Sequence, residues 1–298
     1  MAELRRFLAV TLLVVLVAGC QARPTPLTDD PPEPLPTYED VHASSQERVG
    51  SLDRFWADAA VGLRFKDADG DSRREQGEGH FQIVKPSSVA LTVGKLGETY
   101  LLLGCDDDRF WWIERLDERI AYVGDQNGAR DLATARVGVP VLPTDLLKLA
   151  DLNAWPEPGS PEAGNVIEIE RGDLDASKIF AVEFDEGDRK RVVYLTRLAH
   201  QPVGVDLVTD AGEIAARSQL LGFERVLNRI DPLNHQRVPS RILVDVPSAE
   251  SRIELSLSRM EISNRRPRAL VFDFDELVRR FRIDTVVPLE DIELGAGR

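Results

Sequence analysis

Residues 79–93 read GHFQIVKPSSVALTV, two apolar segments joined by a short polar turn. In the first segment Phe81 and Ile83 flank a polar residue, which is the period of a strand with one buried face. Pro86 ends that segment, and Val89 begins the next one after two serines. So short a connection joins antiparallel neighbours, because parallel strands need a long crossover. This stretch therefore predicts a β-hairpin.

The same pattern recurs along the chain. Short runs of alternating apolar and polar residues are separated by clusters of Gly, Pro and Asp, which favour turns. These runs lie near residues 61–65, 100–103, 110–113, 120–123, 180–184, 203–207, 214–220, 242–244 and 253–257. Together with the hairpin, they predict an antiparallel meander of about ten strands.

A helix is predicted ahead of these strands. It begins at Ser44 or Ser45, either of which is a good cap, and carries apolar residues at three- and four-residue spacing. The apolar stripe consists of Val49, Leu52, Phe55, Trp56, Ala59 and Ala60.

Two shorter helices are expected farther along the chain. One covers residues 143–149 with Thr144 as its cap, and the other covers residues 273–281 with Asp273 as its cap. Strands and helices in this order predict an α+β fold. We expect one strongly bent antiparallel sheet of about ten strands with the helices packed on one face.

The chain opens with the features of an export signal. Arg5 and Arg6 precede an apolar run of about ten residues, which is too short to span a bilayer. The run ends in Val17-Ala18-Gly19-Cys20, which resembles the lipobox of bacterial lipoproteins. That resemblance implies removal of a signal peptide at residues 1–19 and attachment of palmitate-type chains to Cys20, which would hold the protein on membrane lipid. The alternative is an ordinary secretory signal followed by a chance cysteine.

A proline-rich segment follows this cysteine. Residues 20–43 contain six prolines and few apolar side chains. Proline fixes φ and removes a hydrogen-bond donor, so the segment is predicted to be an extended tether. The remainder, residues 44–298, is long enough to form a single β-domain with its own core.

The composition excludes one class of partner. The 298 residues carry a net charge of −14, so the chain repels phosphate backbones and nucleic acid is not an expected partner. The only cysteine besides Cys20 is Cys105, so lipidation of Cys20 would leave no internal disulfide. Cys105 adjoins an apolar run and is expected to be a small buried hydrophobe.

The order of helix, meander, mid-chain helix and further strands, preceded by a lipobox, resembles the LolA/LolB superfamily of bacterial lipoprotein carriers and receptors. The hairpin at 79–93 and the following Gly94-Lys95-Leu96-Gly97 are similar to a strand, a Lys-Pro turn and a Leu-Gly loop of that family. Residues 107–112, DDRFWW, resemble a later hairpin in which an acidic turn precedes aromatic residues. The resemblance implies that the bent sheet is an incomplete barrel, with the helices packed on its concave face around an apolar cavity.

Three residues are candidate contacts for lipid or cargo. In the receptor branch of the family, an exposed Leu after such a strand helps to pass on lipidated cargo, and Leu96 is the matching position. The alternative is a Leu folded back on the core. Trp111 and Trp112 are neighbours in a predicted strand and should point to opposite faces. One should then fill the core or the cavity, and the other should lie under a helix or be exposed.

Other patterns carry weaker signals for chemistry. Carboxylates between Asp67 and Glu78 follow the spacing of an EF-hand loop, but Ser72 replaces the required glycine, which favours a solvated turn. Residues 106–108, three aspartates, read as another turn. The four histidines lack metal spacing, and we find no catalytic or phosphate-binding motif. We therefore expect no enzyme activity, no metal and no cofactor.

Two basic runs stand out in this acidic chain. Residues 189–191 read RKR and residues 265–268 read RRPR. We interpret both as solvated turns, and contact with lipid head groups or a partner is the alternative.

Together these features predict a lipid-anchored, non-enzymatic protein of the bacterial cell envelope that binds an acyl chain or lipidated cargo. Gln21, rather than an Asp that signals retention at the inner membrane, follows Cys20 and favours the outer membrane, facing the periplasm. The longer second half and the acidity depart from the family and favour binding over transfer. The alternative is a structural or assembly lipoprotein that only contacts other envelope proteins. A void lined by residues such as Leu91, Phe110 and Val205 would favour the first function, and a filled interior the second.

Overall fold

The computed structural model describes residues 34–66, 70–115, 119–126, 141–169, 178–187 and 189–291. Apart from residue 34, these belong to one compact unit, Leu35–Arg298. Within these ranges no helix is long and apolar enough to cross a membrane. Cys20 and most of the predicted tether lie outside the described residues.

Fifteen strands form one mixed sheet in the described part of the chain. In chain order they are β1 (Arg54–Lys66), β2 (Ser72–Val84), β3 (Ser88–Lys95), β4 (Glu98–Cys105), β5 (Arg109–Glu114), β6 (Ile120–Asp125), β7 (Asn165–Ile167), β8 (Ile179–Asp185), β9 (Arg189–Thr196), β10 (Pro202–Thr209), β11 (Ile214–Arg225), β12 (Leu227–Asn228), β13 (Arg237–Val246), β14 (Ser251–Ile262) and β15 (Thr285–Pro288).

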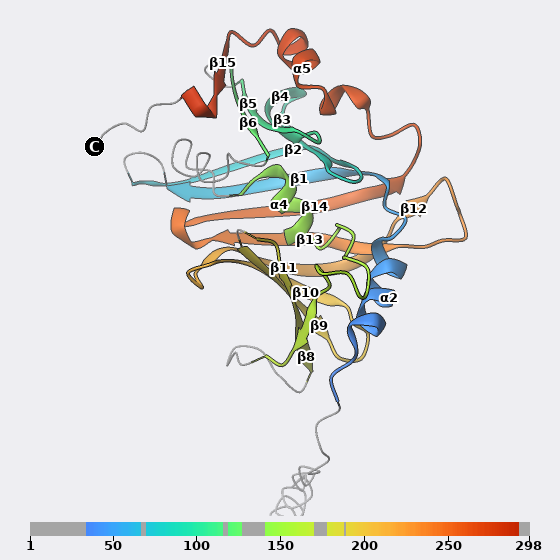
Figure 1. Ribbon diagram of the computed structural model, residues 1–298. Coiled ribbons are helices and arrows are strands. Elements are labelled where there is room, and N and C mark those ends of the chain that lie inside the picture. Colours follow the sequence, from blue (N-terminus) through green and yellow to red (C-terminus); the bar gives the residue numbers. More distant parts are fainter. Residues whose placement is uncertain are drawn as a thin grey trace, which may run out of the picture. The chain divides into compact units, whose positions relative to one another are not determined.

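Most neighbours in the sheet are also neighbours in the sequence. The order is β15-β6-β5-β4-β3-β2-β1-β14-β13-β11-β10-β9-β8-β7, with β12 paired to β14 off this path. β1 joins the two halves, because it pairs with β2 on one side and with β14 on the other. The pairs β15–β6 and β12–β14 are parallel, and the others are antiparallel. In Figure 1 the central strands run across the view and the outer ones turn upright, which is the twist of a large sheet.

This sheet corrects the prediction of a strongly bent incomplete barrel. It is open, with β15 and β7 as its edges, and it is not strongly curled. It has fifteen strands rather than about ten. The alternation did not predict four of the strands: β7, β12 and β15 have only two to four residues, and β9 begins with the basic run at 189–191. The interpretation of that run as a solvated turn is wrong, because Arg189 and Arg191 are buried in the strand. The fold is therefore mostly β rather than α+β.

Alternate residues of β1 define the two faces of the sheet. Phe55, Ala57 and Ala59 are buried together in the main core, and we call their side the core face. Trp56 and Asp58 point to the opposite side, which we call the outer face.

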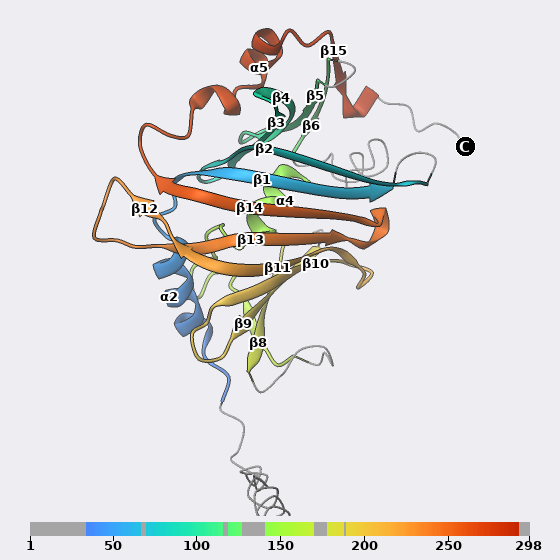
Figure 2. The same cartoon turned by 180° about the vertical axis from the view of Figure 1, so that it is seen from behind.

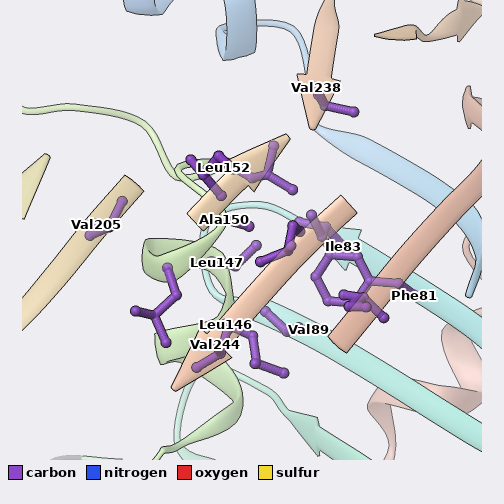
Figure 3. Packing of buried hydrophobic residues seen from close by; sticks show 14 of the residues in the cluster. Phe81, Ile83, Val89, Leu146, Leu147, Ala150, Leu152, Val205, Val238 and Val244 are labelled. Carbon is purple, nitrogen blue, oxygen red and sulfur yellow. The ribbon is translucent and has the colours of Figure 1, made fainter. Parts of the chain in front are cut away.

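Helices α2 (Tyr38–Val49) and α4 (Pro143–Leu149) pack on the core face. α4 lies in front of the central strands in Figure 1 and behind them in Figure 2, which is drawn from the other side. Figure 3 shows Leu146 and Leu147 of α4 among strand residues such as Ile83, Val89 and Val244. Each buried side chain of this size contributes about 1.5–3 kcal/mol, so this cluster is the main source of stability.

The C-terminal segment packs on the outer face. It contains the 3-10 turn η2 (Ala269–Phe272) and helix α5 (Phe274–Phe281). Phe274 and Leu277 of α5 form a second apolar cluster with Trp111 and Ile113 of β5. Helices therefore cover both faces, and the prediction that all of them share one concave face is wrong. The remaining 3-10 turns are η1 (Pro247–Ala249) and η3 (Leu289–Asp291).

The first predicted helix is wrong in its position. α2 ends at Val49, and most of the apolar stripe belongs to β1. The stripe misleads because β1 is buried on both faces near its start, with Phe55 on the core face and Trp56 on the outer face. Adjacent apolar residues then imitate a helical pattern. The actual cap is Thr37, whose side chain accepts a hydrogen bond from the backbone of Asp40 at 3.3 Å.

The other two helices lie where the sequence predicts them. α4 is capped at Leu142 rather than at Thr144, and Asp145 accepts a hydrogen bond from the Leu142 N–H at 2.9 Å. In α5 the predicted cap is confirmed, because Asp273 Oδ1 accepts from the N–H of Glu276 at 2.9 Å. α2 begins at Tyr38, so ordered structure starts within the segment 20–43 that was expected to be tether.

Candidate functional site

A long groove crosses the outer face of the central strands. Its volume is about 1310 Å³, and residues of β1, β2, β13 and β14 line it. The floor is low because small side chains face each other there: Ala60 pairs with Ser256, and Asp58 pairs with Ser258. We call this hollow the outer groove.

Charged side chains in the outer groove include ion pairs. Arg241 Nη2 lies 2.7 Å from Glu254 Oε1, and Arg252 Nε lies 3.3 Å from Asp245 Oδ1. Exposed pairs of this kind contribute about 0–1 kcal/mol each to stability. They give the groove a polar floor that water can wet.

A smaller hollow lies beneath the C-terminal segment, and we call it the α5 pocket. Its volume is about 470 Å³, within the ~300–1,000 Å³ range of pockets for small ligands. Its apolar lining consists of Trp56, Leu102, Leu270, Val271, Leu277 and Phe281. Four exposed arginines also line it: Arg259, Arg266, Arg268 and Arg280.

The helical period explains the apolar wall that α5 contributes. Leu277 and Phe281 are four residues apart and therefore lie on one helical face. Leu277 is fully buried and Phe281 is half-buried, while Arg280 is exposed beside them. α5 thus gives the pocket both an apolar surface and a positive charge.

The basic run at residues 265–268 is fixed to the sheet next to this pocket. The backbone N–H of Arg268 donates to Oε1 of the buried Gln82 at 3.1 Å. The carbonyl oxygen of Pro267 accepts a hydrogen bond from Arg54 Nη2 at 3.2 Å. The run is therefore an anchored part of the pocket's wall as well as a turn.

Two of the pocket's arginines contact other residues that line it. The guanidinium carbon of Arg266 lies 4.2 Å from the ring centroid of Trp56, within the range of a cation–π contact. Arg259 forms an ion pair with Asp58, and His80 Nδ1 lies 3.2 Å from the same carboxylate. The register of β1 with β14 shifts between Trp56 and Asp58, and Arg259 has a φ of 49° there. Such bulges redirect side chains next to binding sites.

Arg268 and Arg280 are differently placed. Among the residues that the structure describes, neither guanidinium has a carboxylate within ion-pair distance. Asp58 is the single carboxylate among the residues that line the pocket. The α5 pocket therefore carries an excess of positive charge in a chain whose net charge is −14.

The α5 pocket adjoins the outer groove. Five residues line both hollows: Asp58, His80, Thr92, Thr99 and Arg259. A ligand in the pocket could therefore extend along the outer face of the sheet.

Leu96 lies at the tip of the β3–β4 hairpin and is 100% exposed. Its φ of 55° is unusual for a residue with a side chain, and Gly97 follows with a φ of 88°. Leu96 also lines the end of the outer groove. The alternative of a Leu folded back on the core is therefore excluded, and its role as a contact stays a prediction.

Trp111 and Trp112 lie on opposite faces, as the alternation requires. Trp111 is fully buried beneath α5, with its ring centroid 5.7 Å from that of Phe274. Trp112 is half-buried and packs against the main core. Neither side chain lines the outer groove or the α5 pocket, so the structure does not gather the two tryptophans and Leu96 into one site.

The cavity expected on the core face does not coincide with either hollow. Leu91, Phe110 and Val205 are buried members of the main cluster. None of the three lines the outer groove or the α5 pocket. The two hollows are on the outer face instead.

Other candidate residues have structural roles. Asp106 Oδ1 accepts hydrogen bonds from the N–H groups of Asp108 and Arg109, which confirms the predicted turn. Cys105 is buried, as predicted, and burial raises the pKa of its thiol to about 12. Within the described ranges no three His, Cys, Asp or Glu side chains group as metal ligands would. Asp67 lies outside the described residues.

The sequence alone did not reveal the α5 pocket. Its arginines come from β14, from the run at 265–268 and from α5. Only the run stands out in the sequence, where it favours a solvated turn, with contact to lipid head groups or a partner as the alternative. The available signal was the pairing of that run with an amphipathic helix shortly after it. Nothing in the sequence showed that this helix would cross to the outer face.

Comparison with solved structures identifies the fold. A LolA superfamily protein from Nitrosomonas europaea matches 80% of this chain and 99% of its own with a TM-score of 0.51, at 12% sequence identity. At that identity the match shows the fold alone. The predicted resemblance to the LolA fold is confirmed.

Two weaker matches accompany it. A DUF1329 family protein from Desulfovibrio piger covers 80% of this chain and 97% of its own, with a TM-score of 0.48 and 12% identity. An outer membrane lipoprotein-sorting protein domain from Vibrio parahaemolyticus covers 78% and 94%, with a TM-score of 0.45 and 12% identity. No protein-family model matches the sequence, and no curated protein matches it.

Proposed function

We propose that this protein is a lipid-anchored lipoprotein of the bacterial cell envelope that binds an acyl chain or lipidated cargo. In this account Cys20 carries the anchor, the signal peptide at residues 1–19 is removed, and the domain faces the periplasm from the outer membrane. The domain acts as a carrier or receptor and performs no catalysis.

The observation that carries the proposal is the LolA-like fold following a lipobox. The Nitrosomonas protein with this fold is described as a LolA superfamily member. The sequence supplies an independent reason for membrane attachment, because a cysteine that bears several acyl chains stays on a bilayer without a spanning helix.

The position of Leu96 supports contact with an apolar partner. A fully exposed Leu on a strained hairpin tip stabilises nothing in the fold, yet it stands at the end of a groove. An apolar side chain held in this way is suited to touch an acyl chain or a membrane surface. Trp111 and Trp112 are less suited, because α5 and the core cover much of them.

A structural or assembly role is the second candidate, and one observation favours it. Leu91, Phe110 and Val205 fill the core face where a lipid cavity was expected. In this structural role the domain binds no lipid and contacts only other envelope proteins. The two functions differ in whether the domain takes up lipid at all.

The test uses the full chain and a Cys20→Ala variant in a bacterial host. Radiolabelled palmitate should enter the wild type and not the variant, and only the wild type should fractionate with membranes. In a second arm, the purified protein is mixed with a synthetic dipalmitoylated cysteine peptide and passed through a sizing column. Elution of peptide with protein supports the carrier function, whereas no uptake of any acylated probe favours the structural role.

A further inference from the structure

We infer that the α5 pocket binds one single-chain amphiphile with an anionic head group. The acyl chain lies against the apolar lining, and the carboxylate or phosphate lies at Arg268 and Arg280. This inference rests on the proposed function and deepens it, since it names the head group and places the ligand on the outer face.

The size and lining of the pocket select an acyl chain. The volume of about 470 Å³ lies within the ~300–1,000 Å³ range of sites for small ligands, which suits a single acyl chain. The fold already buries Trp56, Leu102 and Leu277, so the apolar surface left for a ligand belongs to the half-buried Leu270, Val271 and Phe281. A purely polar anion would leave this apolar surface facing water.

The charges of the pocket select an anion. Four arginines face a single carboxylate, Asp58, and Arg259 already pairs with it. Arg266 is occupied by the Trp56 ring and lies 3.8 Å from Glu261. Arg268 and Arg280 remain available to a ligand among the described residues. Guanidinium groups bind carboxylate and phosphate oxygens with paired hydrogen bonds.

The opening of the pocket provides space for the head group. All four arginines are exposed, so a head group bound to them stays in contact with water. The shared lining with the outer groove leaves room for a larger head group over the outer face.

The experiment is isothermal titration of the full chain with lipids that carry the same fourteen-carbon chain, below their micelle concentrations. Myristate and myristoyl lysophosphatidylglycerol are the anionic probes, and zwitterionic myristoyl lysophosphatidylcholine is the matched control. Inorganic phosphate tests a plain anion site. At least one anionic lipid should bind one to one and about tenfold tighter than the zwitterionic lipid. The tighter anionic probe shows whether the head group is a carboxylate or a phosphate.

Two variants tie this binding to the pocket. Arg268→Gln with Arg280→Gln should weaken the anionic lipid about tenfold and leave the zwitterionic one unchanged. The matched control, Arg265→Gln with Arg279→Gln, removes the same charge from the same run and the same helix outside the lining. It should change neither affinity. Val271→Trp fills the pocket and should abolish binding of every lipid, with circular dichroism confirming the fold.

Several results would overturn the inference. Equal affinity for anionic and zwitterionic lipids would show that the pocket has no head-group preference. An equal loss of affinity in the control variant would show that the preference depends only on the overall positive charge of this region. Phosphate binding as tightly as the lipid would leave a plain anion site. Anionic lipid that binds the Val271→Trp variant as tightly as the wild type would overturn the pocket, and uptake of the dipalmitoylated peptide by the same variant would leave the proposed function standing. Failure of every acylated probe would overturn both.

Discussion

The guanidinium of Arg266 stacks on the ring of Trp56, 4.2 Å from its centroid, and covers a tryptophan that is only 7% exposed. A contact of this kind at an exposed site contributes about 0.5–1 kcal/mol. Arg266→Ala should therefore lower the free energy of unfolding by up to about 1 kcal/mol and shift tryptophan emission to longer wavelength. Urea unfolding monitored by fluorescence measures both. Arg265→Ala, one position earlier, should change neither, and equal effects of the two variants would contradict the stacking.

Leu96 should matter for contact and not for stability. Leu96→Ser removes an exposed apolar side chain, so we expect the free energy of unfolding to stay within about 0.5 kcal/mol of the wild type. Binding of the dipalmitoylated peptide or of lipid vesicles should fall. The matched control is Leu198→Ser, because Leu198 is 98% exposed on another hairpin. If both variants bind as well as the wild type, the assignment of Leu96 is wrong.

Cys105 should make stability fall at high pH. Burial raises the pKa of its thiol from 9.0 to about 12, so the folded protein holds the proton that the unfolded chain releases. This contribution is fully present below pH 9 and is lost as the pH rises toward 12. At pH 10 the loss should be roughly 1 kcal/mol.

The check on Cys105 compares urea unfolding of the wild type and Cys105→Ala at several pH values. Burial raises the pKa of Tyr38 and Tyr100 and lowers that of Lys85, and these groups act in both proteins. The difference between the two curves therefore isolates the thiol. If the difference in the free energy of unfolding stays constant from pH 8 to pH 11, the thiol ionises as freely in the folded protein as in the unfolded chain, and the prediction is wrong.

Asp151 should be needed for the packing of α2 against the segment after α4. It is fully buried, and its carboxylate pairs with Arg48 and accepts from Trp155 Nε1 at 2.9 Å. Arg191 Nη1 lies 3.7 Å away and is also buried. Asp151→Asn leaves these guanidiniums without that negative charge, so we expect the free energy of unfolding to fall by about 3 kcal/mol or more. The control is Asp210→Asn, at an exposed turn, which should leave the free energy of unfolding almost unchanged. Denaturant unfolding measures both variants, and equal small effects would contradict the role of Asp151.

Local patterns predicted the elements whose surroundings are simple. The hairpin at 79–93 and the cap at Asp273 depend on neighbours a few residues away, and both appear in the structure. The prediction failed for the start of β1, because the burial of this strand depends on two distant partners. The main core covers Phe55, and Arg266, more than two hundred residues later, covers Trp56. A single sequence shows that both are apolar and does not show that they face opposite layers.

The candidate site was predictable only in part. Leu96 could be found because a hairpin tip is a local feature, and its exposure follows from the turn. The α5 pocket could not be predicted, because its wall combines residues of β1, of β4 and of a helix that follows the last long strand. The curvature of the sheet was also beyond the sequence, since twist and closure arise from the pairing of all the strands.

Native mass spectrometry of the full-length gene product, extracted from membranes in mild detergent, tests the central claim most directly. The account predicts a chain that starts at Cys20 with acyl groups attached covalently, and a bound lipid in about one-to-one ratio that Val271→Trp removes. A polypeptide without acyl groups, and with no lipid retained by the wild type, would contradict it.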